Sequence, residues 1–225
     1  MTKTRQHNKG FTLIELMIAM FLSIMVISGI FALFRNQVAI HNTERLIVSM
    51  QQNVRAAVSF MERDIRLAGS DPSGTSGAAF LSANEAQLQF QTDADEDGLI
   101  GAGETVTYAL SGGNLVRGTA VPFIAAAAPV VARNIDALNF DYFDSAGNNI
   151  SDKSLIPWVV PVNQIARVEV SIVARSGDAV PGLFIKRMDS NVYRNQSGDQ
   201  ILPAQNDFFR RMQITTDIDC RNTAN

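Results

Sequence analysis

The sequence predicts an α+β protein in which one long N-terminal helix packs on a domain of antiparallel β-strands. Three observations carry this prediction. Residues 11–34 are mostly apolar and carry one charged residue, residues 35–69 are amphipathic with a helical period, and the sequence after Gly69 alternates between apolar and polar residues. A chain of 225 residues has room for one such helix and a single globular domain. We therefore expect the regions 1–10, 11–34, 35–69 and 70–225.

The apolar segment 11–34 is long enough to cross a membrane as a helix. At about 1.5 Å per residue it would measure roughly 36 Å, against a hydrocarbon core of about 30 Å. The leader 1–10 is basic, and the positive-inside rule places it in the cytoplasm and the domain outside. A secretory signal has its small-residue cleavage site after the apolar core, whereas here Gly10 comes before it. Cleavage after Gly10 would remove the leader and keep the helix.

Glu15 is the one charged residue of the apolar segment. A lone carboxylate at membrane depth costs about 2.5–3.5 kcal/mol on insertion scales, so it needs a partner and indicates a function. The segment offers no basic side chain, and a buried carboxylate requires a buried cation. The alternative is a signal-anchor helix that carries a glutamate by chance.

The motif G-F-T-L-I-E at residues 10–15 resembles the class III signal of type IV pilins and type II secretion pseudopilins. The resemblance implies a pilin-like fold, cleavage between Gly10 and Phe11 by the prepilin peptidase, and methylation of the new Phe11 amine by the same enzyme. It also implies an assembly role for Glu15, which would pair with the Phe11 amine of a neighbouring subunit.

The same resemblance implies where the chain works and with what. The partners would be other major and minor pilins and the inner-membrane pilus assembly platform. The chain would cross the bacterial inner membrane once, with its C-terminal domain in the periplasm, and would then enter a pilus filament at the cell surface.

Apolar residues recur at steps of three and four through the second half of the predicted helix. They are Ile47, Met50, Val54, Ala57, Met61, Ile65 and Ala68. No proline interrupts the pattern, and Gly69 followed by Ser-Asp-Pro predicts the helix end. A continuous helix over residues 11–68 would be about 87 Å long.

Beyond Gly69, period-two alternation predicts half-buried antiparallel strands. The predicted strands cover residues 86–91, 105–110, 138–142, 167–172 and 212–219. Residues 111–114 and 145–149 read as turns, and residues 70–77 as a flexible link. A sheet with one apolar face needs a cover, which the helix stripe would supply.

Two further segments resemble those of PilW-like minor pilins. Residues 60–69 are similar to their helix end, and residues 210–218 to their final strand. This resemblance implies a minor pilin that acts in the assembly or initiation of a type IV pilus. One alternative is a J-like type II secretion pseudopilin. Another is a membrane-anchored calcium-binding adhesin that never polymerises.

Residues 93–104 match D-x-D-x-D-G-x5-E, the twelve-residue calcium loop of EF-hands, at every defined position. The predicted metal-site residues are Asp93, Asp95, Asp97, Leu99, Gly101 and Glu104.

In such a loop the aspartates give carboxylate oxygens, Leu99 gives its carbonyl, Gly101 leaves room for a bridging water, and Glu104 binds bidentately. Because the donors are all oxygens, the loop suits Ca²⁺. Predicted strands flank the loop, so we expect a structural Ca²⁺ that orders a strand–loop–strand connection. The alternative is a solvated acidic turn without metal.

Other features argue against an enzyme and against bulk nucleic-acid binding. The formal charge is −3 with no dominant basic region. His41 is expected on the helix surface, and no nucleophile motif or phosphate-binding loop accompanies it. Cys220 is the single cysteine, so it is either a buried inert thiol or an intermolecular link. The arginines at 210, 211 and 221 are expected at a solvated strand end, with an acidic partner as the alternative.

Overall fold

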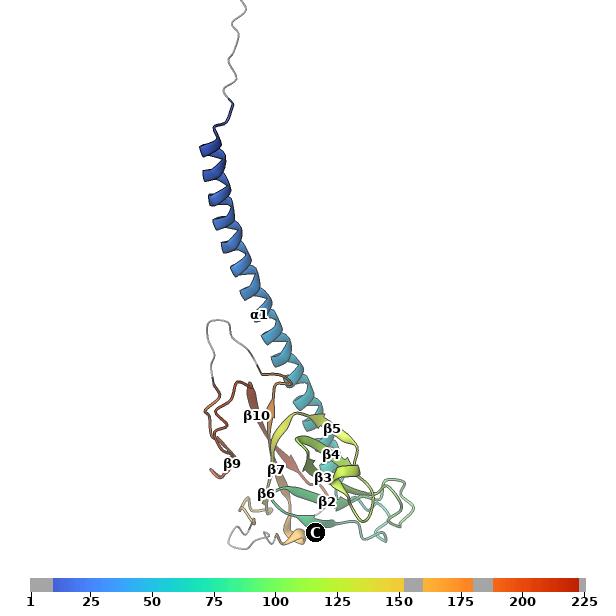
Figure 1. The fold of residues 1–225 in the computed structure, drawn as a ribbon. Coiled ribbons are helices and arrows are strands. Elements are labelled where there is room, and N and C mark those ends of the chain that lie inside the picture. The colour runs from blue at the N-terminus through green and yellow to red at the C-terminus, as the bar shows by residue number, and fades with distance from the viewer. Residues whose placement is uncertain (1–9, 152–159, 180–187, 223–225) are drawn as a thin grey trace, which may run out of the picture.

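The chain forms one long helix that stands out from a β-rich domain (Figure 1). A computed structural model describes residues 10–151, 160–179 and 188–222. Most of the predicted leader, residues 1–9, lies outside the described residues. Helix α1, Leu13–Arg66, has 54 residues and is therefore about 81 Å long. Its first half projects away from the domain and its second half lies against the sheets, so the predicted fold class is confirmed.

Antiparallel strands make up the domain in two main sheets. The five-stranded sheet has the order β1-β2-β3-β4-β5, with β1 Phe80–Ala83, β2 Gln87–Gln91, β3 Thr105–Ser111, β4 Asn114–Gly118 and β5 Val130–Arg133. The three-stranded sheet has the order β10-β7-β6, with β10 Arg211–Asp219, β7 Arg167–Arg175 and β6 Ile135–Phe143. A small hairpin pairs β8 Tyr193–Arg194 with β9 Gln200–Leu202, and the 3-10 helices are η1 Ala125–Ala127 and η2 Val162–Gln164.

One stripe of α1 forms the centre of the core. Its buried residues within the helix are Met50, Val54, Ala57, Met61 and Ile65. They belong to the predicted stripe, whose other members are Ile47, which is half-buried, and Ala68, which is buried just beyond the helix end. Both sheets supply the facing side chains, among them the fully buried Phe90 and Tyr108 of the first sheet and Phe140 and Ile172 of the second. The helix therefore joins two sheets into one hydrophobic core.

Polar contacts fix the helix on both sheets beside this core. Asp64 Oδ2 accepts hydrogen bonds from the Tyr108 hydroxyl at 2.7 Å and from Arg117 Nε at 2.6 Å. Burial of Tyr108 and the Asp64 charge raise the pKa of this phenol above its ordinary value. On the other sheet, the Thr216 hydroxyl donates to Glu62 Oε1 at 3.0 Å. Helix and sheets are thus held in a defined register by directional bonds.

Strands β6 and β7 of the second sheet differ from the prediction because they are covered on both faces. Asn139, Asp141, Glu169 and Ser171, expected on the solvent face, are buried. The segment 188–210, which contains β8 and β9, lies over this face. Leu202 packs there against Ala137 and Val173. The prediction of half-buried strands was therefore wrong for β6 and β7.

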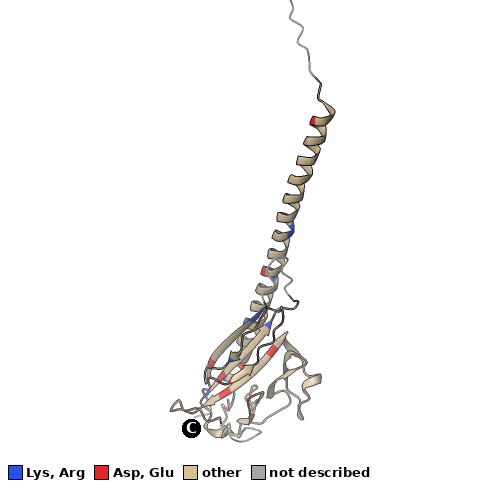
Figure 2. Cartoon of the chain, turned by 60° about the vertical axis from the view of Figure 1, so that its left-hand side comes forward, with Lys and Arg blue, Asp and Glu red and all other residues tan. Residues whose placement is uncertain are grey.

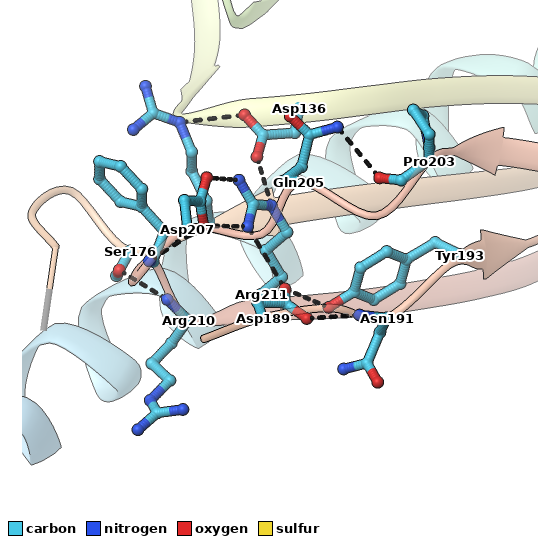
Figure 3. Close-up of polar contacts among 12 residues, drawn as sticks. Asp136, Ser176, Asp189, Asn191, Tyr193, Pro203, Gln205, Asp207, Arg210 and Arg211 are labelled. Carbon is cyan, nitrogen blue, oxygen red and sulfur yellow. Dashed lines mark hydrogen bonds and ion pairs between the residues drawn. The ribbon is translucent and has the colours of Figure 1, made fainter. Parts of the chain in front are cut away.

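Arg211 holds this covering segment in place (Figure 3). Its side chain is 2% exposed and donates to Asp136, to Asp189 and, through both terminal nitrogens, to Asp207. The bidentate contact with Asp207 raises the pKa of the Arg211 guanidinium above its ordinary value and lowers that of the Asp207 carboxyl. The expectation of a solvated strand end is wrong for Arg211, because its charge is paired inside the domain.

The core stripe gives a direct test of this packing. We expect Met61→Ala to lower the free energy of unfolding by about 2–5 kcal/mol, because Met61 is fully buried between helix and sheets. The matched change Phe60→Ala, one residue earlier at a side chain 59% exposed, should cost less than about 0.5 kcal/mol. Urea unfolding of the detergent-solubilised chain, followed by intrinsic fluorescence, measures both. Equal losses would contradict the assigned helix face.

Glu169 gives a pH-dependent test. It lies in β7 opposite Asp141 of β6 and Asp217 of β10. Burial, together with these two carboxylates, raises the pKa of Glu169 despite a hydrogen bond from the Gln196 amide and the nearby Arg167. Because the folded state then binds the proton more tightly than the unfolded state, stability falls as the pH rises through this range.

We expect Glu169→Gln to remove this loss of stability at higher pH while keeping the oxygen that accepts the hydrogen bond from the Gln196 amide. Its melting temperature should exceed that of the wild type by about 2–4 °C at neutral pH. The difference should shrink as the pH falls towards the ordinary glutamate pKa. Thermal unfolding between about pH 4 and pH 8 measures this. The exposed control Glu85→Gln should show no such trend, and an unchanged melting temperature for Glu169→Gln would contradict the assignment.

Candidate functional site

The first half of α1 presents an apolar surface on all sides. Every large apolar side chain from Leu13 to Phe34 is at least 54% exposed. Figure 2 shows this part of the helix almost free of charge. Within the described residues, α1 is the one helix that is long and apolar enough to span a membrane by length and composition. Such a surface requires a lipid or protein environment.

Glu15 and Thr12 cap the start of this helix. The Thr12 hydroxyl accepts a hydrogen bond from the Glu15 amide at 3.3 Å. Glu15 Oε2 in turn accepts from the Thr12 amide and hydroxyl, each at 3.2 Å. This is a capping box, in which a Thr and a Glu three residues apart satisfy each other's free backbone donors.

The structure thus places the predicted processing and assembly residues together at the tip of the helix. Gly10 and Phe11 directly precede the capping box, and the Phe11 side chain is 88% exposed. Thr12 was missed by the sequence prediction, although T-x-x-E before an apolar run is a known signature of a helix start. Glu15 therefore has a capping role within its own chain, which the sequence prediction did not include.

The acidic loop lies at the opposite end of α1, where it connects β2 to β3. These strands pair in register from Gln87–Ala109 to Gln91–Thr105, as predicted for the flanks of the loop. One carboxylate oxygen from each of Asp93, Asp95 and Asp97 lies within 4.8 Å of the others. The structure therefore brings together three of the predicted metal-site residues.

Glu104 is not part of this cluster of three carboxylates. Its Oε1 accepts hydrogen bonds from the Ala94 amide at 2.6 Å and the Asp95 amide at 3.3 Å, and its Oε2 from the Gly101 amide at 2.6 Å. The bonds from Gly101 and Ala94 lower the pKa of Glu104. Glu104 thus ties the two ends of the loop together, and Gly101 provides one of the donors.

The loop also contacts the segment that follows α1. The Asp93 amide donates to the Ser70 carbonyl at 2.9 Å, and the Thr75 hydroxyl donates to the Gly98 carbonyl at 3.2 Å. Gly98 has a φ of 81°, and a Cβ there would collide with the Thr75 hydroxyl, so the turn requires glycine.

Segment 70–77 is itself organised by one side chain. Asp71 accepts from the Ser73 hydroxyl and from the Thr75 and Gly77 amides. The prediction of a flexible link was therefore wrong here, because these bonds form a compact turn.

Two other sequence candidates have ordinary surroundings. Cys220 is buried, and burial together with the Asp219 charge raises the pKa of its thiol to about 12. The thiol is thus in its unreactive form at neutral pH, as predicted. His41 lies exposed on α1, where it contacts Gln37 and Glu44.

Comparison with known proteins agrees with both the N-terminal motif and the overall fold. Residues 5–33 match the family described as the prokaryotic N-terminal methylation motif. The fold is similar to that of a type IV-like pilin from Thermus thermophilus, with 15% sequence identity, a TM-score of 0.50, and coverage of 78% of this chain and 98% of the other. No curated relative matches the chain. The chain thus carries an N-terminal methylation motif on a type IV pilin-like fold.

Proposed function

We propose that this chain is a minor pilin, a structural subunit that takes part in the assembly or initiation of a type IV pilus. The observation that carries the proposal is the exposed apolar first half of α1, which directly follows the predicted processing site at Gly10 and Phe11 and takes no part in the domain core. A surface of this kind suits storage in a bilayer and later burial among the helices of neighbouring subunits.

In this proposal the prepilin peptidase cleaves between Gly10 and Phe11 and methylates the Phe11 amine. The helix first spans the inner membrane with the β-domain in the periplasm, and the assembly platform then moves it into a filament of major and minor pilins. In this proposal the chain is a structural subunit and not an enzyme.

The geometry of Glu15 fits a contact with a neighbouring subunit. Both capping hydrogen bonds go to Oε2, so Oε1 can accept the Phe11 amine of the next chain without opening the capping box. In an apolar bundle that amine is the cation that a buried carboxylate requires. The pair would fix the register between adjacent helices.

The minor-pilin assignment rests on the resemblance of residues 60–69 and 210–218 to PilW-like proteins. In the structure both segments make contacts that organise the domain. Asp64 joins the helix end to the first sheet, and Arg211 holds the covering segment on the second. These residues define the domain rather than the filament contact.

A type II secretion pseudopilin is the second candidate, because its subunits would need the same exposed helix and the same Glu15. A strain lacking this chain separates the two machines. Loss of sheared surface pili with normal secretion of exoproteins supports the pilus, and the opposite result supports the pseudopilin. A non-polymerising anchor would keep residues 1–10, whereas mass spectrometry of a pilin would find methylated Phe11 at the N-terminus.

Substitutions of Glu15 test the assembly contact. We expect Glu15→Gln to lower incorporation into sheared filaments by at least about tenfold, because it removes the charge that pairs with the amine. Glutamine still accepts a hydrogen bond in a capping box, so membrane insertion and cleavage should be unchanged. Immunoblots of the filament and membrane fractions measure the ratio of incorporated to membrane-held chain.

Glu15→Ala serves as the companion variant, since it removes both the charge and the cap. Loss of incorporation in both variants supports the intermolecular pair. Normal incorporation of Glu15→Gln together with loss in Glu15→Ala would reduce Glu15 to a capping residue and contradict the register argument.

A further inference from the structure

The acidic loop contains a buried carboxylate oxygen that the protein leaves unsatisfied. Asp93 is 2% exposed. Its Oδ2 accepts a hydrogen bond from the Gly98 amide at 3.2 Å, whereas its Oδ1 has no hydrogen-bond partner among the described residues. A buried polar atom without a partner is costly, so it calls for a ligand.

The surroundings of Asp93 identify the charge of that ligand. The Asp93 carboxylate lies within 4.8 Å of carboxylate oxygens of Asp95 and Asp97, both of which are exposed. Negative groups this close repel one another, and no basic side chain lies in residues 92–104. A cation among the three would satisfy the orphaned oxygen and remove the repulsion.

We propose that Asp93, Asp95 and Asp97 bind one Ca²⁺ ion. The donor set consists of hard oxygen ligands, which excludes a preference for zinc or copper. Ca²⁺ accepts several carboxylates with irregular geometry, whereas Mg²⁺ prefers to keep most of its waters. The Leu99 carbonyl and water molecules complete the shell.

Glu104 separates this site from the EF-hand pattern that the sequence matches. Both of its oxygens accept hydrogen bonds from backbone amides on the two sides of the loop. Glu104 therefore holds the loop in shape, and the aspartates at its tip bind the ion. The metal site needs fewer protein ligands than the twelve-residue pattern suggests, which is consistent with the weak affinity of extracellular calcium modules, about 10⁻⁴–10⁻³ M.

Bound Ca²⁺ would also stiffen the junction between α1 and the domain. The Asp93 amide donates to the Ser70 carbonyl and the Gly98 carbonyl accepts from the Thr75 hydroxyl. Residues 70–77 are therefore hydrogen-bonded to the loop. Order in the loop is thus linked to order in the segment that leaves the helix.

The test uses the full chain in detergent, freed of metal by chelation. We expect CaCl₂ at about 10 mM to raise the melting temperature by about 3–10 °C, as follows from an affinity in the range above. MgCl₂ at the same concentration should give a much smaller shift. Isothermal titration with CaCl₂ should give one site per chain.

Two matched variants localise the site. Asp95→Asn removes one ligand at an exposed position and should abolish the calcium shift while leaving the metal-free melting temperature unchanged or higher. Glu96→Gln removes the same charge from the same loop outside the triad and should keep most of the shift. Asp93→Ala is less suitable alone, because Asp93 also accepts the Gly98 amide.

Hydrogen exchange gives a second readout. Calcium should slow exchange at residues 70–77 and 93–104 in the wild type and in Glu96→Gln, but not in Asp95→Asn. The proposal is overturned if CaCl₂ changes neither melting nor exchange in the wild type, if Asp95→Asn responds like the wild type, or if MgCl₂ matches CaCl₂.

Discussion

The structure depends on the burial of one stripe of α1 against two sheets. Both sheets pack over the stripe from Met50 to Ile65. Because this contact completes the domain core, the first half of the helix contributes nothing to it. The exposed apolar surface from Leu13 to Phe34 is thus a consequence of how the core is built, and it remains available for a membrane and for other helices.

At the start of the helix, one side chain both caps its own chain and could bind a second partner under the proposed function. Glu15 uses Oε2 for the Thr12 donors of its own chain, and a helix start exposed to lipid needs such a cap because no water reaches its free amides. The proposed pairing with a neighbouring Phe11 amine would add a charge-assisted bond to the same carboxylate. The cap would favour that contact, since it holds the carboxylate in a fixed orientation before a neighbour arrives.

The sequence predicted the helix, its buried stripe and the hairpin around the acidic loop, because each has a strong period or a specific motif. Leu88 and Phe90 alternate cleanly with polar residues, and both are fully buried. Strands β1, β4 and β5 were missed because they are short and carry weak alternation. The covered face of β6 and β7 was missed for another reason. Asn139 and Glu169 are polar, and the contacts that hold segment 188–210 over them join residues far apart in the sequence, such as Asn195 with Asp141 and Arg211 with Asp136.

The same limit applies to the candidate metal site. The spacing of Asp93, Asp95 and Asp97 was enough to bring their carboxylates together, because a tight turn at Gly98 allows few arrangements. The role of Glu104 could not be read from spacing, since it depends on which backbone amides the folded loop directs towards it. A motif constrains the ends of a loop better than the orientation of its last side chain.

The acidic loop and the end of α1 form one junction. This junction links the proposed calcium binding to the proposed assembly of the helix into a filament. The Gly69 amide bonds to the Gln91 carbonyl at 2.9 Å where α1 meets β2, and Asp64 ties the last turn of the helix to β3 and β4. A force that draws the apolar helix out of a membrane and into a filament would reach the domain through these contacts and through the buried stripe of α1. An ion that orders residues 93–104 would stabilise the domain's part of this junction. Calcium would then stabilise the attachment of the domain to its helix without taking part in the contact between subunits.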